Sequence, residues 1–136
     1  MNRSRLLATV SAAQMVFGVS GLAVALRRRH AFDIPGWKGS PDRVATDAAW
    51  MGTALSAPGP MLVAQAVATV MTARRPSRSA RRVLGLLGGG MSIGYPIERL
   101  VRHRLTPAGW DPVESPLALG GWALAIAMAA TSAAAE

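Results

Sequence analysis

The stretch LLATVSAAQMVFGVSGLAVAL, residues 6–26, contains no charged side chain. A bilayer core about 30 Å thick requires about 20 apolar residues of helix, because each residue adds about 1.5 Å. The stretch therefore predicts a helix that crosses a membrane. Arg3 and Arg5 precede it, as basic residues precede the core of a signal peptide, but the stretch exceeds the usual signal core of about 7–15 residues. We interpret it as the first membrane helix.

Three further stretches lack charged side chains, namely residues 48–73, 83–97 and 115–135. Only 16% of the 136 residues are charged, whereas an average soluble domain has about 25%. The pattern predicts an all-α, polytopic membrane protein, a four-transmembrane-helix bundle that forms one integral membrane domain over residues 1–136. The expected helices cover residues 6–26, 41–73, 83–101 and 116–134. A very apolar soluble bundle is the alternative.

Prolines predict kinks in the second and third of these helices. Pro58-Gly59-Pro60 interrupts the second helix and Pro96 the third. Each proline lacks a backbone donor and clashes with the carbonyl four residues before it. The carbonyls of Ala54 and Ser56 must therefore find other partners within the protein.

Local signals also mark a turn and two helix starts. Pro35-Gly36 predicts a turn between the first and second helices. Ser40-Pro41 and Ser115-Pro116 predict the starts of the second and fourth helices, with serine as N-cap and proline at the first helical position.

Small residues repeat at helical spacing in the third and fourth helices. Such residues let helix backbones approach closely, which drives packing in lipid. They therefore predict close helix contacts, and a homo-oligomer through the Gly/Ala faces is one way to use them. The residues are Gly85 with Gly89, Gly90 with Gly94, and the set Gly121, Ala125, Ala129 and Ala133.

The net charge of +8 does not indicate nucleic acid, because the basic residues flank the apolar stretches. Arginines in such places meet lipid headgroups, so the bilayer is the expected partner and the cell membrane the expected location, with several crossings. Seven arginines fall on one side of the expected bundle and eight basic residues on the other, so the positive-inside rule gives no clear orientation. The density of arginines in residues 74–82 favours a cytoplasmic position for that link, and insertion in both orientations is the alternative.

Acidic residues are scarce and gather at one end of the expected bundle, together with aromatic residues. An ionisable group within or near the membrane is costly, so it is a functional candidate by default. A carboxyl removed from water there has a raised pKa, which suits a proton donor at neutral pH. The predicted catalytic residues are Asp47, Glu98 and Glu114. The predicted substrate-binding residues are Trp50, Tyr95, Trp110, Gln14 and Gln65.

Simpler explanations stand beside these predictions. Glu98 and Arg102 have the spacing of an ordinary ion pair at a helix end. The tryptophans fit an interfacial belt, and Gln14 and Gln65 fit hydrogen bonds between helices. The chain has no cysteine, and His30 and His103 lack a second ligand at metal spacing, so we expect no metal and no cofactor.

Three hypotheses for function follow. The first is a membrane-embedded acid/base enzyme acting on a lipophilic small molecule, of the isomerase, cyclase or epoxide-opening type. The second is a small oligomeric transporter, and the third a non-catalytic accessory subunit of a larger membrane complex. In size and expected crossings the chain resembles the small multidrug transporters, whose first helix has an embedded glutamate where this chain offers only Gln14.

Overall fold

The fold is all-α over residues 2–134, which the computed structural model describes. This part of the chain contains six α-helices and one short β-hairpin. The helices are α1 (Arg3–Arg28), α2 (Val44–Trp50), α3 (Gly59–Arg74), α4 (Arg78–Ile97), α5 (Arg99–Arg104) and α6 (Glu114–Ala133). The antiparallel strands are β1 (Asp33–Ile34) and β2 (Trp37–Lys38), and single 3₁₀ turns cover Pro41–Arg43 and Pro107–Gly109.

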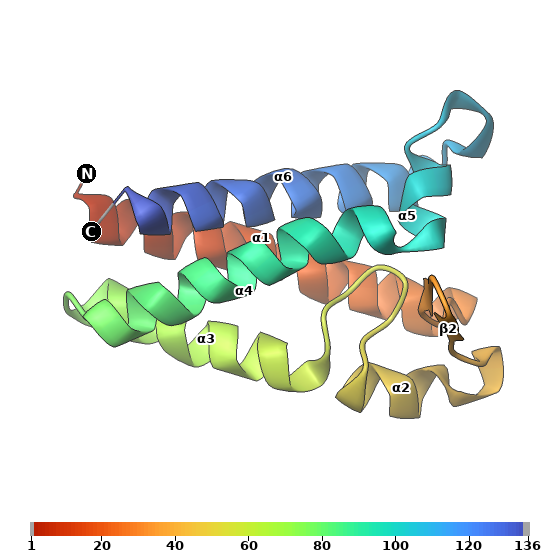
Figure 1. Cartoon of the computed structure of the whole chain (residues 1–136), viewed down its shortest axis with the longest axis horizontal. Coiled ribbons are helices and arrows are strands. Elements are labelled where there is room, and N and C mark those ends of the chain that lie inside the picture. Colours follow the sequence, from red (N-terminus) through yellow and green to blue (C-terminus); the bar gives the residue numbers. More distant parts are fainter. Residues whose placement is uncertain (1, 135–136) are drawn as a thin grey trace.

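Four helical rows lie along the long axis of the molecule, each antiparallel to its neighbours (Figure 1). α1 and α6 each form one row, α5 continues α4, and α2 with α3 forms the fourth. α6 packs against α1 and α4, and α3 packs against the same two helices. Both termini and the α3–α4 link lie at one end, which we call the terminal end. The β-hairpin, α2 and the α5–α6 link lie at the other, which we call the hairpin end.

The structure corrects the expected single kinked helix over residues 41–73. The irregular segment 51–58 separates α2 from α3 and contains Gly52, whose φ of +91° favours glycine. Ser56 lies in this irregular segment and not in a helix, so Pro60 does not remove a helical donor from it. Its carbonyl accepts the N–H of Thr53 at 3.1 Å, a partner within the protein.

The other helix boundaries differ less from the expected ones. α4 begins earlier than expected, because the Ser77 hydroxyl caps it by accepting the N–H of Ala80. The predicted N-cap at Ser40 is confirmed by its hydrogen bond from the Asp42 N–H. The predicted N-cap at Ser115 is wrong, because α6 already begins at Glu114.

The kink predicted at Pro96 is a full break, because the helix expected over residues 83–101 divides into α4, which ends at Ile97, and α5. A tryptophan compensates for the donor that Pro96 lacks. The carbonyl of Ser92, four residues earlier, accepts the indole N–H of Trp122 at 2.9 Å. Arg102 donates to the carbonyls of Pro96 and Ile97 at 3.0 and 2.6 Å, which lie where α4 ends. The chain then continues as α5 in a new direction, with Glu98 at the junction.

The close contact between α4 and α6 uses Gly85, which belongs to a predicted pair, and Gly88, which does not. A Cβ on Gly85 would stand 2.5 Å from the Ser132 Oγ of α6. A Cβ on Gly88 would stand 2.8 Å from the backbone N of Ala129 and 2.9 Å from the carbonyl O of Ala125. The small residues of α6 are therefore packed against α4 within the same chain. In contrast, a Cβ on Gly89, Gly90 or Gly94 would meet no atom within 4 Å.

By length and composition, α1 and α6 can cross a membrane, and no other helix in residues 2–134 meets that standard. α3 has only 16 residues, or about 24 Å of helix. α4 is long enough, but the three arginines in its first turns shorten its charge-free part.

Candidate functional site

Glu98 lies in the wall of an apolar pocket of about 180 Å³ at the hairpin end. Its position follows from the break at Pro96, because the junction between α4 and α5 turns the side chain inward, where it is 5% exposed. Apolar side chains from α4 and from the irregular segment 51–58 form most of the surroundings. The polar side chains in the wall are those of Glu98, Tyr95, Thr53 and Ser56.

The Glu98 carboxyl is held by two backbone groups, one in the β-hairpin and the other at Leu100. The N–H of Asp33 donates to both oxygens, at 2.9 Å to Oε1 and 3.1 Å to Oε2. A buried carboxyl that keeps a polar partner and faces a pocket can act as a general acid and as a general base.

Glu114 lies in a different environment, which we call the Glu114 cluster. Its side chain is fully buried, and three basic side chains contact its carboxylate. Arg28 Nη1 and His30 Nε2 lie 2.7 and 2.8 Å from Oε1, and Arg104 Nε lies 2.6 Å from Oε2. The cluster joins the ends of α1, α5 and α6, so its geometry is that of a structural clamp.

Asp111 extends the Glu114 cluster and caps α6. Its Oδ1 accepts the N–H groups of Val113 (2.9 Å) and Glu114 (2.8 Å), and its Oδ2 accepts Arg28 Nη1 (3.0 Å). The backbone N–H groups of Glu114 and Val113, with smaller help from Arg28, lower the pKa of Asp111 to about 2. Asp111 thus supplies the cap that the sequence assigned to Ser115.

Gln14 and Gln65 meet inside the bundle, behind the pocket wall. Neither lines the pocket, but Gln14 is hydrogen-bonded to Tyr95 and Met91, which do. Gln65 Nε2 donates to Gln14 Oε1 at 2.8 Å, which joins α3 to α1. Ser11 and Thr69 form a second link between these helices, with 2.7 Å between their hydroxyl oxygens. This is the pattern of hydrogen bonds between helices, the simpler explanation for the two glutamines.

The remaining predicted residues lie near the surface of the hairpin end. Trp50 ends α2 and Trp110 lies in the α5–α6 link, and both are exposed. Asp47 is half-buried in α2, with its carboxylate beside Gly39.

The structure therefore brings two of the predicted residues, Glu98 and Tyr95, into one pocket. Asp47 and Glu114 do not line that pocket, and their catalytic roles stay predictions, as do the substrate-binding roles of Trp50, Trp110, Gln14 and Gln65. No cluster of three His, Asp or Glu side chains able to hold a metal occurs in the described residues 2–134.

Several residues of the site were missed in the sequence. The basic partners of Glu114 resemble the other basic residues that flank the apolar stretches. No local sequence pattern identifies the N–H of Asp33 as a hydrogen-bond donor to Glu98. The sequence did not predict that residues 51–58 form part of the pocket wall, because that segment was expected to be helical.

Comparison of the chain with protein-family models, curated proteins and solved structures found no match.

Proposed function

We propose that the chain is a four-span integral membrane protein and a membrane-embedded acid/base enzyme that transfers protons to and from a lipophilic molecule. The observation that carries the proposal is the buried Glu98 carboxyl in the wall of an otherwise mostly apolar pocket.

The distribution of side chains supports the membrane part of the proposal. Large apolar residues are exposed on the outer faces of all four rows; Leu86 of α4, for example, is 77% exposed. Other examples are Val16, Val63 and Ile126. The interior, in contrast, contains polar side chains, including Ser11, Gln14, Gln65, Thr72 and Ser132. Water favours the reverse arrangement, whereas lipid favours apolar surfaces around small and polar helix contacts.

The helix lengths fit this arrangement when the rows are taken whole. α6 has 20 residues, or about 30 Å, which matches a bilayer core. α3 is too short alone, but α2 and the segment 51–58 complete its row (Figure 1). Irregular backbone is tolerated at membrane depth when protein surrounds it or when it lines a cavity. Residues 52–55 are buried and the segment lines the pocket, so it meets this condition.

The chemistry that one carboxyl can perform is proton transfer in both directions. As carboxylate, Glu98 removes a proton from one carbon of a bound molecule, and this proton exchanges with water; as carboxylic acid, Glu98 then delivers a proton to another carbon. The net result is an isomer, with no change in oxidation state and no second reactant. A cyclisation that starts with protonation and ends with proton loss has the same balance. Tyr95 lies in the same wall and can position the substrate.

Deuterium exchange tests the proposed function even though the substrate is unidentified. The full chain in lipid nanodiscs is incubated in D₂O with a total lipid extract, and mass spectrometry searches for lipids that gain deuterium on carbon. A carboxyl that exchanges with solvent between its two steps must introduce this label. We expect labelled lipid with the natural protein and none with Glu98→Gln. Equal labelling by both proteins, or none with either, would contradict the proposal.

Two glycine substitutions test whether the lipophilic substrate binds in the Glu98 pocket. Gly94 lines the pocket and Gly89 does not, yet a Cβ on either would meet no atom within 4 Å. Gly94→Leu should therefore fill the pocket and block labelling. Gly89→Leu adds a side chain of the same size outside the pocket, so labelling should continue. Loss of labelling in both variants would exclude the pocket as the site of reaction.

A transporter is the second candidate, because the interrupted row of α2 and α3 lies beside the pocket. Interrupted helices commonly form the binding sites of transporters. This candidate predicts proton-coupled uptake of a lipophilic compound into protein-containing vesicles, and no label on carbon in D₂O.

A further inference from the structure

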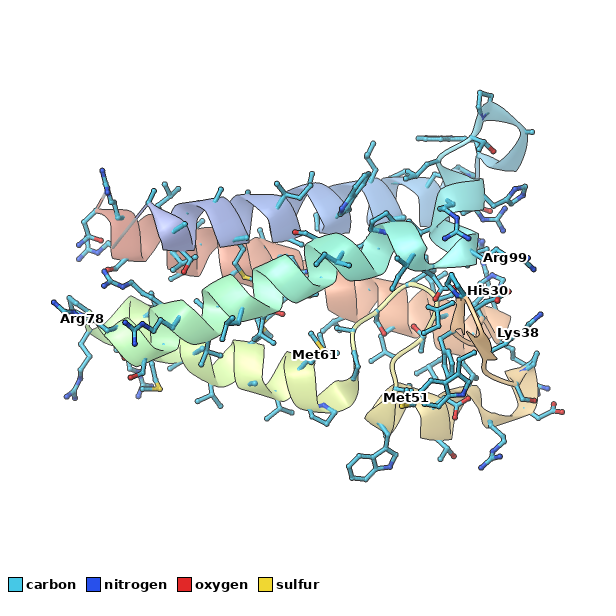
Figure 2. The ribbon with its side chains drawn as sticks, viewed as in Figure 1. His30, Lys38, Met51, Met61, Arg78 and Arg99 are labelled. Atoms are coloured by element: carbon cyan, nitrogen blue, oxygen red, sulfur yellow. The ribbon has the colours of Figure 1, made fainter. Side chains whose placement is uncertain are left out.

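A second hollow, which we call the basic cleft, lies at the hairpin end. It encloses about 320 Å³ between the end of α1, the β-hairpin and α5. Arg29 follows α1, Lys38 lies on β2, and Arg99 begins α5, so three separate elements bring a cation to one place. Figure 2 shows the side chains of Lys38 and Arg99 at this end, close to His30. His103 also lines the cleft.

The cations of the basic cleft form only long ion pairs. Asp33 is the carboxylate in its lining, and both Lys38 Nζ and Arg99 Nη1 lie 3.8 Å from its Oδ2. Arg29 Nη1 is equally far from Asp42 Oδ1, which lies outside the lining. By comparison, the two arginines of the Glu114 cluster lie 2.7 and 2.6 Å from their carboxylate. Three cations against these two carboxylates leave the basic cleft with an excess of positive charge, and the long separations leave hydrogen-bond donors unused.

The backbone under these cations is well fixed. Asp33 pairs with Lys38 in the hairpin, and its N–H is bound to Glu98. The N–H of Gly39 donates to the carbonyl of Phe32 at 2.8 Å. The three charged groups, in contrast, are 69–74% exposed. A fixed base with accessible charged ends is suited to an anion that arrives from outside.

The basic cleft and the Glu98 pocket lie on opposite faces of the same two elements. In the hairpin, Phe32 and Ile34 line the pocket while Asp33 lines the cleft. In α5 and the junction before it, Glu98 and Val101 line the pocket, whereas Arg99, Leu100 and His103 line the cleft. The cleft is therefore a separate feature, and the proposed chemistry at Glu98 does not use it.

We propose that the basic cleft binds a phosphate group through Arg29, Lys38 and Arg99. Guanidinium groups bind phosphate oxygens in pairs, and lysine adds a point charge. In the proposed membrane arrangement the hairpin end lies among headgroups, so the phosphate can belong to a lipid or to a soluble compound.

The test measures phosphate binding by the full chain in phosphatidylcholine nanodiscs. Inorganic phosphate is titrated calorimetrically against a sodium chloride blank of equal ionic strength. In a second arm, phosphatidic acid is added to the nanodiscs and the lipid retained by the protein is counted by native mass spectrometry. We expect the combined substitution of Arg29, Lys38 and Arg99 by glutamine to weaken binding about tenfold, because contacts at exposed positions are individually weak.

A matched control separates a specific site from general attraction to a basic protein. Glutamine at Arg74, Arg75 and Arg78 removes the same charge from exposed residues at the terminal end, and should leave binding within about twofold of the natural protein. Equal weakening by both triple variants would overturn the proposal, as would the absence of binding in both arms. Retention of phosphatidic acid alone identifies a lipid source, and binding of inorganic phosphate identifies a site open to soluble phosphate as well.

Asp33→Asn changes binding in the opposite direction. It removes the lining carboxylate while keeping the backbone N–H that binds Glu98. We expect phosphate to bind about threefold more tightly, since a like charge next to the anion is lost. A disturbed fold cannot produce tighter binding, so unchanged or weaker binding in a folded Asp33→Asn protein would contradict the assignment.

Discussion

Replacement of Glu114 by glutamine is expected to lower the free energy of unfolding by about 3 kcal/mol, the largest loss we predict for a single side chain. The glutamine has nearly the same shape but carries no charge. Its amide cannot accept hydrogen bonds from Arg28, His30 and Arg104 at both of its terminal atoms, as the carboxylate does. Reversible thermal or denaturant unfolding of the purified chain in detergent measures the loss.

The matched control for Glu114 is Asp42→Asn. Asp42 also lies within ion-pair distance of an arginine, at 3.8 Å from Arg29, but both side chains are exposed. An exposed pair of this kind contributes about 0–1 kcal/mol. Stability losses of equal size in the two variants would show that the Glu114 cluster is no more than a surface ion pair.

The helices themselves were largely predictable, because what defines them is local in the sequence. The charge-free stretch 6–26 corresponds to α1, and the stretch 115–135 to α6, since a run of apolar residues is sufficient to indicate a helix of that length. Pro96 and Ser40 were also informative, because a missing donor and an N-cap act within four residues.

The candidate site was only partly predictable, because it is built from residues far apart in the chain. Glu98 was chosen for its depth near a helix end, and it does line a pocket. Its hydrogen-bond donor, the N–H of Asp33, is 65 residues away in the sequence, and His30 is 84 residues from Glu114. No local pattern states that α1, α5 and α6 converge at these side chains. The acidic residues gathered at one end as predicted, but the packing divided Glu98 and Glu114 between a pocket and a clamp.

Glycine spacing in the sequence predicted which helices pack closely, but not every glycine at the contact. The sequence predicted close packing of the third and fourth helices, and α4 does approach α6 closely. It named Gly85, which does face α6, but it paired this residue with Gly89 and missed Gly88, because several glycines in a row satisfy the spacing rule on different faces. The orientation of α4 about its own axis selects Gly88, and that orientation depends on every neighbouring helix.

The second large effect is expected for Gly88→Ala, which should destabilise the protein by about 2 kcal/mol. The new methyl group would stand 2.8 Å from the backbone N of Ala129 and 2.9 Å from the carbonyl of Ala125. Backbone atoms of a packed helix cannot rotate away as a side chain can, so α4 and α6 must separate. Because α6 also packs against α1, the separation weakens contacts beyond the substituted residue. Unfolding in detergent measures the loss.

The adjacent substitution Gly89→Ala provides the control, since it adds the same methyl group to the same helix. A Cβ at Gly89 meets no atom within 4 Å, so the methyl group costs nothing in packing. Alanine also favours the helical backbone over glycine, by about 0.5–1 kcal/mol, so this variant should be slightly stabilised. Relative to the natural protein, the free energy of unfolding should therefore fall for Gly88→Ala and rise slightly for Gly89→Ala. The two variants should differ by about 3 kcal/mol. Equal stability of the two variants would mean that α4 does not meet α6 through Gly88, and the arrangement of the four rows would have to be revised.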